Sequence, residues 1–186
     1  MKQFELNKVI ENLTKLKGQP FNEILRTGSM VCLGFGDKIK SKTVYKTTDG
    51  LFEVKESQKS KYALHIDGLF RISYNDKMLL TRDDIFKPSN AIGDNNFDKK
   101  TFEWDVAGNN RFDEEITDIF HLTKQTPIVK DIRVNMFGDL SITLSNGYNI
   151  DVFIDTNEAE ECWRFFEVGN NEIPHIVITG HGYCEE

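Results

Sequence analysis

The sequence feature that most constrains the fold is a set of alternating apolar and polar residues interrupted by tight-turn dipeptides. Apolar residues occupy every second position over 140–144 and again over 150–154, and Asn146-Gly147 separates the two runs. An Asn-Gly pair between two alternating segments is the strongest local signal for a β-hairpin, because both residues tolerate the left-handed conformation that the turn requires. The segment therefore predicts two antiparallel strands and constrains this half of the chain to a β-sheet.

The same reasoning predicts antiparallel strands over most of the chain. Residues 37–60 are polar and rich in lysine, which predicts exposed strands with a long loop. Each of the other predicted strands is short and bounded by turn residues. The strands are 21–26 and 30–35 around Gly28-Ser29, then 61–66, 69–74 and 77–81 joined by Asp67-Gly68 and Asn75-Asp76, and finally 132–136, 161–167 and 174–179.

Two segments have helical spacing instead. Leu6, Val9, Ile10, Leu13 and Leu16 form one apolar stripe, and Gly18 and Pro20 follow it as helix-ending residues. Residues 112–124 have a second stripe, with acids in the first turn where the helix dipole favours them. Between residues 82 and 111 lies a polar connector in which Phe102 and Trp104 are expected to fold back onto the core. Antiparallel strands with two helices predict an α+β fold.

A faint repetition indicates how the chain is built. Phe35-Gly36-Asp37 returns as Phe137-Gly138-Asp139, and each triplet is followed by an apolar strand that begins with tyrosine, at Tyr62 and at Tyr148. Each half then contains an aromatic-arginine pair, Phe70-Arg71 and Trp163-Arg164. We expect one domain over 1–186 with an internal duplication of 20–90 and 128–182, joined by a connector and helix over 91–127. Glycines 34, 36 and 138 are expected at bulges or tight turns.

The charge is distributed unevenly along the chain. Residues 1–93 have 16 basic and 11 acidic side chains, a balance of +5, whereas residues 94–186 have 7 and 19, a balance of −12. An acidic field of this kind repels nucleic acid and attracts a cationic partner. Two simpler interpretations remain open: the acids keep the surface soluble, or the basic half docks on the acidic half within the molecule.

Several classes of function lack a signal. No apolar run approaches the roughly 20 residues that span a bilayer, and the charged N-terminus lacks the apolar region of a signal peptide. Three scattered cysteines, Cys32, Cys162 and Cys184, are typical of reduced thiols in a cytoplasmic protein. The histidines lack the spacing of a metal site, and no phosphate-binding loop or nucleophile elbow is present. We therefore predict no metal, no cofactor and no catalytic residue.

The segments "FEWDVAGNNRFD", "FGDLSITLSNGYNIDVF", "ECWRFFE" and "HIVITGHG" together resemble a family of uncharacterised bacterial proteins. The resemblance covers roughly residues 20–182, and the C-terminal WRFF…HIVITG pattern is its most specific part. In that family the first aromatic-arginine pair is Trp-Arg, whereas this chain has Phe70-Arg71. The resemblance implies a shared fold unit and no chemistry. Small acidic proteins of this type are similar to the immunity proteins of bacterial toxin systems.

These observations predict a non-catalytic cytoplasmic protein-binding module, such as an immunity protein that neutralises a cationic toxin, without affinity for nucleic acid or membrane. The sequence leaves the oligomeric state open. In the alternation of the last strands, Trp163 and Phe165 share one face, which is either the core or a binding surface. The predicted contact residues are Asp155, Glu158, Glu160, Glu161, Trp163 and Arg164. The alternative is a small-molecule or enzymatic domain with a pocket between the halves, lined by Arg71, Arg164, His65 and His175 to hold an anionic ligand.

Overall fold

The computed structural model describes residues 1–93, 97–121, 125–170 and 172–185. These residues form two α-helices, one 3₁₀ helix and eleven strands, which confirms the predicted α+β fold with antiparallel sheets. In chain order the elements are α1 (Gln3–Thr14), β1 (Phe21–Thr27), β2 (Met30–Lys46), β3 (Phe52–Ile66), β4 (Leu69–Tyr74), β5 (Lys77–Thr81), η1 (Arg82–Phe86), α2 (Arg111–His121), β6 (Val129–Val134), β7 (Leu140–Leu144), β8 (Tyr148–Phe153), β9 (Glu161–Glu167), β10 (Ile176–Thr179) and β11 (Gly182–Glu185).

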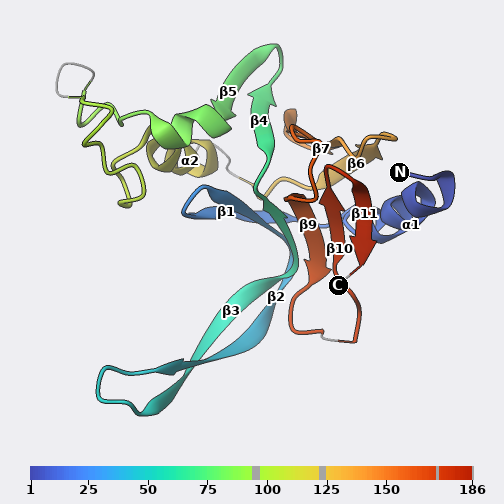
Figure 1. The fold of residues 1–186 in the computed structure, drawn as a ribbon, viewed down its shortest axis with the longest axis horizontal. Helices are drawn as coiled ribbons and strands as arrows, with labels where there is room; N and C mark the ends of the chain where they lie inside the picture. The colour runs from blue at the N-terminus through green and yellow to red at the C-terminus, as the bar shows by residue number, and fades with distance from the viewer. Residues whose placement is uncertain (94–96, 122–124, 171, 186) are drawn as a thin grey trace.

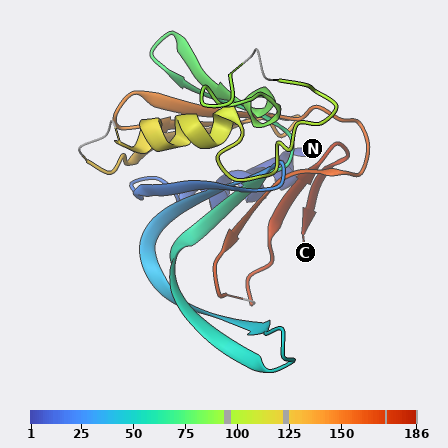
Figure 2. The same cartoon turned by 90° about the vertical axis from the view of Figure 1, so that its left-hand side faces the viewer.

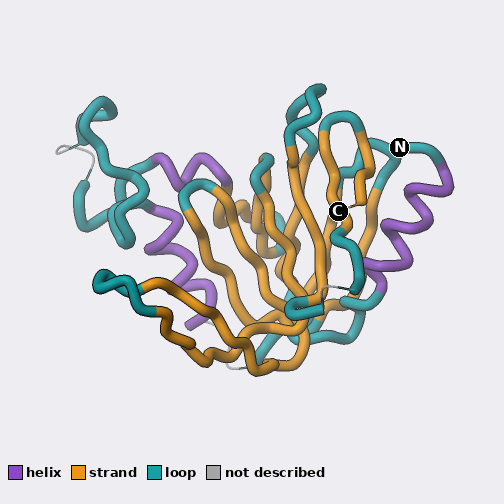
Figure 3. Tube along the Cα trace, turned by 60° about the horizontal axis from the view of Figure 1, so that its bottom comes forward, coloured by secondary structure: helices purple, strands orange, loops and turns teal. Residues whose placement is uncertain are grey.

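The strands form two antiparallel sheets that face each other (Figures 1 and 2). The first sheet has the strand order β1-β2-β3-β9-β10-β11, and the second has the order β5-β4-β8-β7-β6. The start of β1 also joins the start of β6, where the amide of Phe21 donates to the carbonyl of Pro127 over 2.8 Å. The two helices lie on opposite sides of the molecule (Figure 3), with α1 beside the edge strands β6 and β11 and α2 beside the edge strand β5. The apolar faces of both sheets therefore enclose one core.

The predicted hairpins at Gly28-Ser29, Asn75-Asp76 and Asn146-Gly147 are confirmed, but the one at Asp67-Gly68 is wrong. Strands β3 and β4, on either side of Asp67-Gly68, belong to different sheets. The amides of Asp67 and Gly68 both donate to the carbonyl of Cys162 over 2.9 Å. These hydrogen bonds hold in place the segment that crosses from the first sheet to the second. A local turn signal cannot distinguish a hairpin from a crossover, because the difference depends on which strand comes alongside.

Residues 37–60 lie mostly in exposed strands, as predicted, but the prediction of a long loop in this segment is wrong. Strands β2 and β3 continue to pair as far as Lys46 and Phe52, so only residues 47–51 connect them. The result is a long two-stranded ribbon that curls away from the body of the molecule (Figures 1 and 2).

Both predicted helices form. In α1 the side chains of Leu6, Val9 and Leu13 are buried, whereas Ile10 is 41% exposed and lies at the edge of the stripe. The last three residues predicted for the second helix, 122–124, lie outside the described residues. Trp104 folds back onto the core as predicted, but Phe102 does not join it and packs its edge on Phe97 at 5.2 Å.

The strand pairing gives the two halves a common topology. In each half a helix precedes a three-stranded meander, β1-β2-β3 or β6-β7-β8, and the chain then crosses to the other sheet. Strand β4 pairs with β8, and β9 pairs with β3, so each half completes the sheet of the other. The pairing register of the crossed strands also matches between the two halves when positions are counted from Tyr62 in β3 and from Tyr148 in β8. The matched pairs are His65 with Arg164 and Asp151 with Arg71, three residues after the tyrosines, and Ile66 with Trp163 and Val152 with Phe70, four residues after them.

The Phe-Gly-Asp triplets do not share this correspondence. Residues 35–37 lie inside β2, whereas residues 137–139 lie between β6 and β7. Both glycines adopt a positive φ, Gly36 at a bulge and Gly138 in a turn, as expected for them. The internal duplication stays a prediction, and the matched register of the crossed strands bears on it more directly than the triplets that first indicated it.

The ion pairs between the two halves of the described chain all have the same polarity. Five ion pairs among the described residues join residues 1–93 to residues 94–185, and the base always comes from the first half. They are Lys8–Glu185, Lys17–Asp131, Arg26–Asp113, Lys61–Glu167 and Arg71–Asp151. Part of the charge asymmetry is therefore satisfied within the molecule, as the intramolecular interpretation expects.

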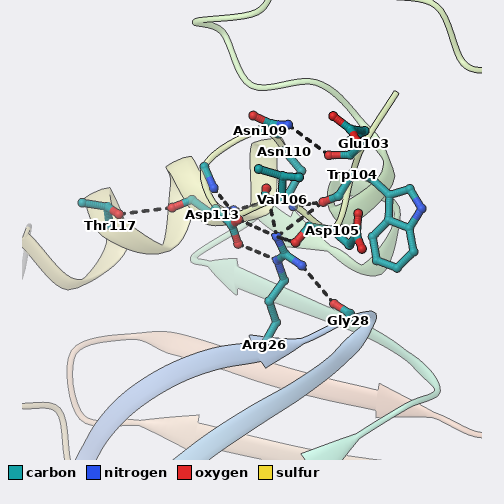
Figure 4. A network of polar contacts seen from close by, with 11 residues as sticks. Arg26, Gly28, Glu103, Trp104, Asp105, Val106, Asn109, Asn110, Asp113 and Thr117 are labelled. Carbon is teal, nitrogen blue, oxygen red and sulfur yellow. Dashed lines mark hydrogen bonds and ion pairs between the residues drawn. The ribbon is translucent and has the colours of Figure 1, made fainter. Parts of the chain in front are cut away.

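Arg26 makes the most buried of these pairs (Figure 4). Its Nε and Nη2 atoms each lie 2.6 Å from an oxygen of Asp113, and the two side chains are only 7% and 14% exposed. Burial alone raises the pKa of Asp113, but hydrogen bonds from Arg26 and from the amide of Gly108 outweigh it, so this pKa lies below its ordinary value. The pair fastens the connector and α2 onto β1.

We expect Arg26→Met to destabilise the protein by about 3–5 kcal/mol, because it leaves the Asp113 carboxylate buried without its cation. The contribution of the pair is fully present above the pKa of an unfolded aspartate, about 3.9, and is lost as the pH falls through the lower folded pKa. Urea unfolding followed by circular dichroism across this range measures both effects. Lys17→Met, which breaks an exposed pair, is the control and should cost less than about 1 kcal/mol; equal costs for the two variants would contradict the argument.

Candidate binding surfaces

The outer face of the first sheet holds a row of chemically active side chains. Strand register places Cys32 opposite His65 and His65 opposite Arg164, so β2, β3 and β9 each contribute one residue. Trp163 and Phe165 point the other way and are buried in the core, at 0% and 3% exposure. Of the two interpretations of these aromatic residues, the structure therefore favours the core. The side chain of Trp163 is inaccessible to a partner, which removes it from the predicted contact surface.

A pocket of about 410 Å³ lies beside this row, beneath the curled ribbon. Its lining includes Gly34, Ala63, His65, Phe166 and Glu23. Gly34 is required here, because a Cβ atom at this position would come within 2.6 Å of both Glu23 and Ser60. The pocket thus depends on small residues at two adjacent strand positions.

Glu23 gives the pocket one ionised group. Ser60 donates to its Oε1 over 2.7 Å, and Lys38 lies 3.0 Å from the same oxygen. Burial acts to raise the pKa of Glu23, but these two partners lower it further than burial raises it. The carboxylate is thus charged at neutral pH and already neutralised by Lys38.

Phe166 lies between two imidazoles on this face. The edge-on contact with His65 has a ring distance of 4.9 Å, and the stacked contact with His175 has one of 4.3 Å. Arg164 contacts Nδ1 of His175 at 3.4 Å and forms a two-point pair with Glu161. Burial, and after it the charge of Arg164, lowers the pKa of His65. His65 is therefore neutral at neutral pH and contributes no positive charge to this face.

Two of the cysteines, Cys32 and Cys162, have thiols that burial makes less reactive. Burial raises the pKa of the Cys32 thiol, which is the cysteine opposite His65, and burial also raises that of Cys162. The thiolate is the reactive form, so a raised pKa leaves both groups weakly nucleophilic at neutral pH. Among the described residues there is also no group of three or more His, Cys, Asp or Glu side chains that could hold a metal ion.

A second hollow, of about 520 Å³, lies where the two crossovers between the sheets meet. Its lining brings Asp67 from the β3–β4 crossover together with Asp155, Glu160 and Glu161 from the β8–β9 crossover. Arg82 lines it as well and lies 3.8 Å from Asp67. Leu69 and Phe153 are paired in β4 and β8; Leu69 lies two residues after Asp67, and Phe153 lies two residues before Asp155. We call these residues, with Glu158, the crossover surface: Asp67, Leu69, Arg82, Phe153, Asp155, Glu158, Glu160 and Glu161.

Three acids of the crossover surface have no ionic partner in the described part of the chain. Asp155, Glu158 and Glu160 are exposed, and none of them lies within ion-pair distance of a described basic group. Glu161, by contrast, is held by Arg164. Four of the six predicted contact residues therefore lie on this surface, and Arg164 adjoins it through Glu161.

The residues predicted to line an anion pocket are only partly brought together. His65, Arg164 and His175 lie on the outer face of the first sheet, but Arg71 lies on the second sheet and pairs with Asp151 at 2.9 Å. Sequence reasoning also missed Asp67 and Arg82 in the hollow. Asp67 was assigned to a hairpin turn, and no local signal marked it as a neighbour of a segment some 90 residues later.

Comparison of the chain with protein-family models, with curated proteins and with solved structures returned no match. None of the described helices has the length and apolar character needed to cross a membrane.

Trp163 lies on the core side of the first sheet and connects that sheet to the second. Its indole Nε1 donates to the carbonyl of Gly138 over 2.9 Å, in a buried environment. Trp163→Phe removes the donor and leaves that carbonyl unsatisfied, so we expect a loss of about 2–3 kcal/mol in the free energy of unfolding. Urea unfolding measures it, with Trp104→Phe at a partly buried site as the control. A loss no greater than that of the control would show that the hydrogen bond is unimportant.

Proposed function

We propose that this protein is a non-catalytic, cytoplasmic protein-binding module whose crossover surface receives a cationic segment of a partner. The observation that carries the proposal is the presence of three exposed acids, Asp155, Glu158 and Glu160, that have no ionic partner among the described residues; Asp155 and Glu160 line the hollow. Complementary charge accelerates encounter and disfavours partners of the wrong sign. The neighbouring apolar pair, Leu69 and Phe153, adds contact area that does not depend on charge.

We propose that the cationic partner is a toxin, which would make this protein an immunity protein that neutralises it. The proposal is supported by the acidic balance of residues 94–186, which remains largely unneutralised after the five ion pairs between the halves. It is also supported by the raised pKa of the Cys32 and Cys162 thiols, which argues against a cysteine nucleophile.

The test uses a fluorescently labelled peptide of alternating lysine and leucine, with a glutamate-leucine peptide as the probe of opposite charge. We expect the lysine peptide to bind the wild-type protein and the triple variant Asp155→Asn, Glu158→Gln, Glu160→Gln to bind it roughly tenfold more weakly, with a smaller dependence on salt. Fluorescence anisotropy at several salt concentrations measures this.

The matched control neutralises three exposed acids elsewhere: Glu11→Gln, Asp76→Asn and Glu103→Gln. It changes the net charge of the protein by the same amount and leaves the crossover surface intact. If both triple variants weakened binding equally, the peptide would be responding to net charge alone and the proposed surface would be rejected.

The pocket beneath the ribbon favours a second candidate function, which is binding of a small ligand. Its volume of about 410 Å³ lies in the range of small-molecule sites. We expect anilinonaphthalene sulfonate, an aromatic probe, to fluoresce more strongly with the wild-type protein than with Ala63→Leu, which fills the pocket. Ala107→Leu, at an exposed position, is the control, and equal fluorescence from all three proteins would count against this site.

A further inference from the structure

The ribbon formed by β2 and β3 beyond the first sheet is the least explained part of the molecule. Strand β1 pairs with β2 only as far as Phe35, and β9 pairs with β3 only from Tyr62 onward. Residues 38–46 and 52–60 therefore pair with each other alone, and we call them, with the connecting residues 47–51, the arm. Among the arm residues whose side chains the structure describes, none belongs to the cluster of buried side chains that forms the core.

The tip of the arm exposes apolar side chains. Val44 and Val54 are directly opposite each other in the ladder and are 62% and 58% exposed. Phe52, two residues along β3 on the same face, is 73% exposed, and Leu51 is 65% exposed. An isolated two-stranded ribbon is only marginally stable in water, so an exposed apolar tip is typical of a segment that is covered in a complex.

The charge of this segment is opposite to that of the crossover surface. The arm, residues 38–60, contains six lysines and three acids, which gives a balance of 6 − 3 = +3. The arm thus combines cationic and apolar side chains, which is the chemistry expected of a segment that fits the exposed acids beside Leu69 and Phe153.

The arm cannot easily reach the crossover surface of its own molecule. Strand β3 has 15 residues, with the arm tip at one end and the crossover at Asp67 at the other. At about 3.3 Å per residue, the strand separates them by up to roughly 50 Å of chain. Figure 1 shows the tip pointing away from the sheets.

We propose that the arm of one molecule occupies the crossover surface of a second copy of this chain. The proposal rests on the proposed function, since it uses the same surface, and it names a partner for it. The contact is head-to-tail, because two different surfaces meet, and it leaves a free arm and a free surface at the two ends. Bound in this way, the arm competes with any other cationic partner for the crossover surface.

The experiment uses two variants of the full chain. The arm variant is Val44→Ser, Phe52→Ser, Val54→Ser, which removes the apolar side chains of the tip and keeps all six lysines of the arm. The surface variant is Asp155→Asn, Glu158→Gln, Glu160→Gln. Circular dichroism checks that both are folded, and Lys40→Gln, Lys42→Gln, Lys46→Gln serves as a second arm variant if the first is not.

We expect sedimentation at low salt to show concentration-dependent association of the wild-type protein and monomers for each variant alone. An equimolar mixture of the two variants should form a dimer that grows no further, because it contains one intact arm and one intact surface. High salt should weaken that dimer roughly tenfold. A surface variant that associates like the wild-type protein would instead indicate contact between arms, and would overturn the proposal.

The outcome can be separated from that of the proposed function. If the lysine-leucine peptide binds the arm variant but no copies associate, the surface is a binding site and the second copy is not its occupant. If the mixture forms no dimer while the wild-type protein still associates, the contact lies elsewhere and the proposal fails.

Discussion

The rest of the structure depends on the reciprocal pairing of β4 with β8 and of β9 with β3. Each of these contacts joins strands from different halves of the chain, and each is reached by a crossover between the sheets. Because the meander of one half is extended by strands of the other, neither sheet is completed by one half alone. The core is continuous for the same reason, and Trp163 shows it most directly: it lies on β9 in the first sheet and donates to a carbonyl in the turn that leads into β7 in the second.

This arrangement also decides where charge gathers. The two crossovers end up beside each other, so the acids that flank them converge although they are distant in sequence. Five ion pairs join the halves among the described residues, and each pairs a base of the first half with an acid of the second. The acids of the β8–β9 crossover are the exception, since no basic residue follows Arg133 except Arg164, which is committed to Glu161. These exposed acids are therefore part of the negative charge of the second half that ion pairs among the described residues do not neutralise.

The candidate surfaces were predictable only in part. The acidic run at 155–161 could be found from the sequence, because acids next to one another stay next to one another in any fold. Asp67 could not be found, since its turn signal is the same whether the chain reverses or changes sheet. The pocket at Gly34 and Ala63 was also beyond prediction, because small residues in strands carry no mark that distinguishes a bulge from a pocket floor. Phe165 and Trp163 were assigned to a shared face correctly, but which face was the core depended on β10 and on the second sheet.

The sequence by itself determined the local structure of this protein. Alternation, turn dipeptides and helical stripes are local, and they specified the antiparallel strands, the two helices and most hairpins, because each depends on residues only a few positions apart. The tertiary structure alone decided which strands are neighbours across the halves, and therefore the meeting of the crossovers, the burial of Trp163 and the isolation of the arm. These depend on contacts between residues as far apart as Tyr62 and Glu167, which are 167 − 62 = 105 positions apart. Their partners are selected by the packing of the whole core and not by any local pattern.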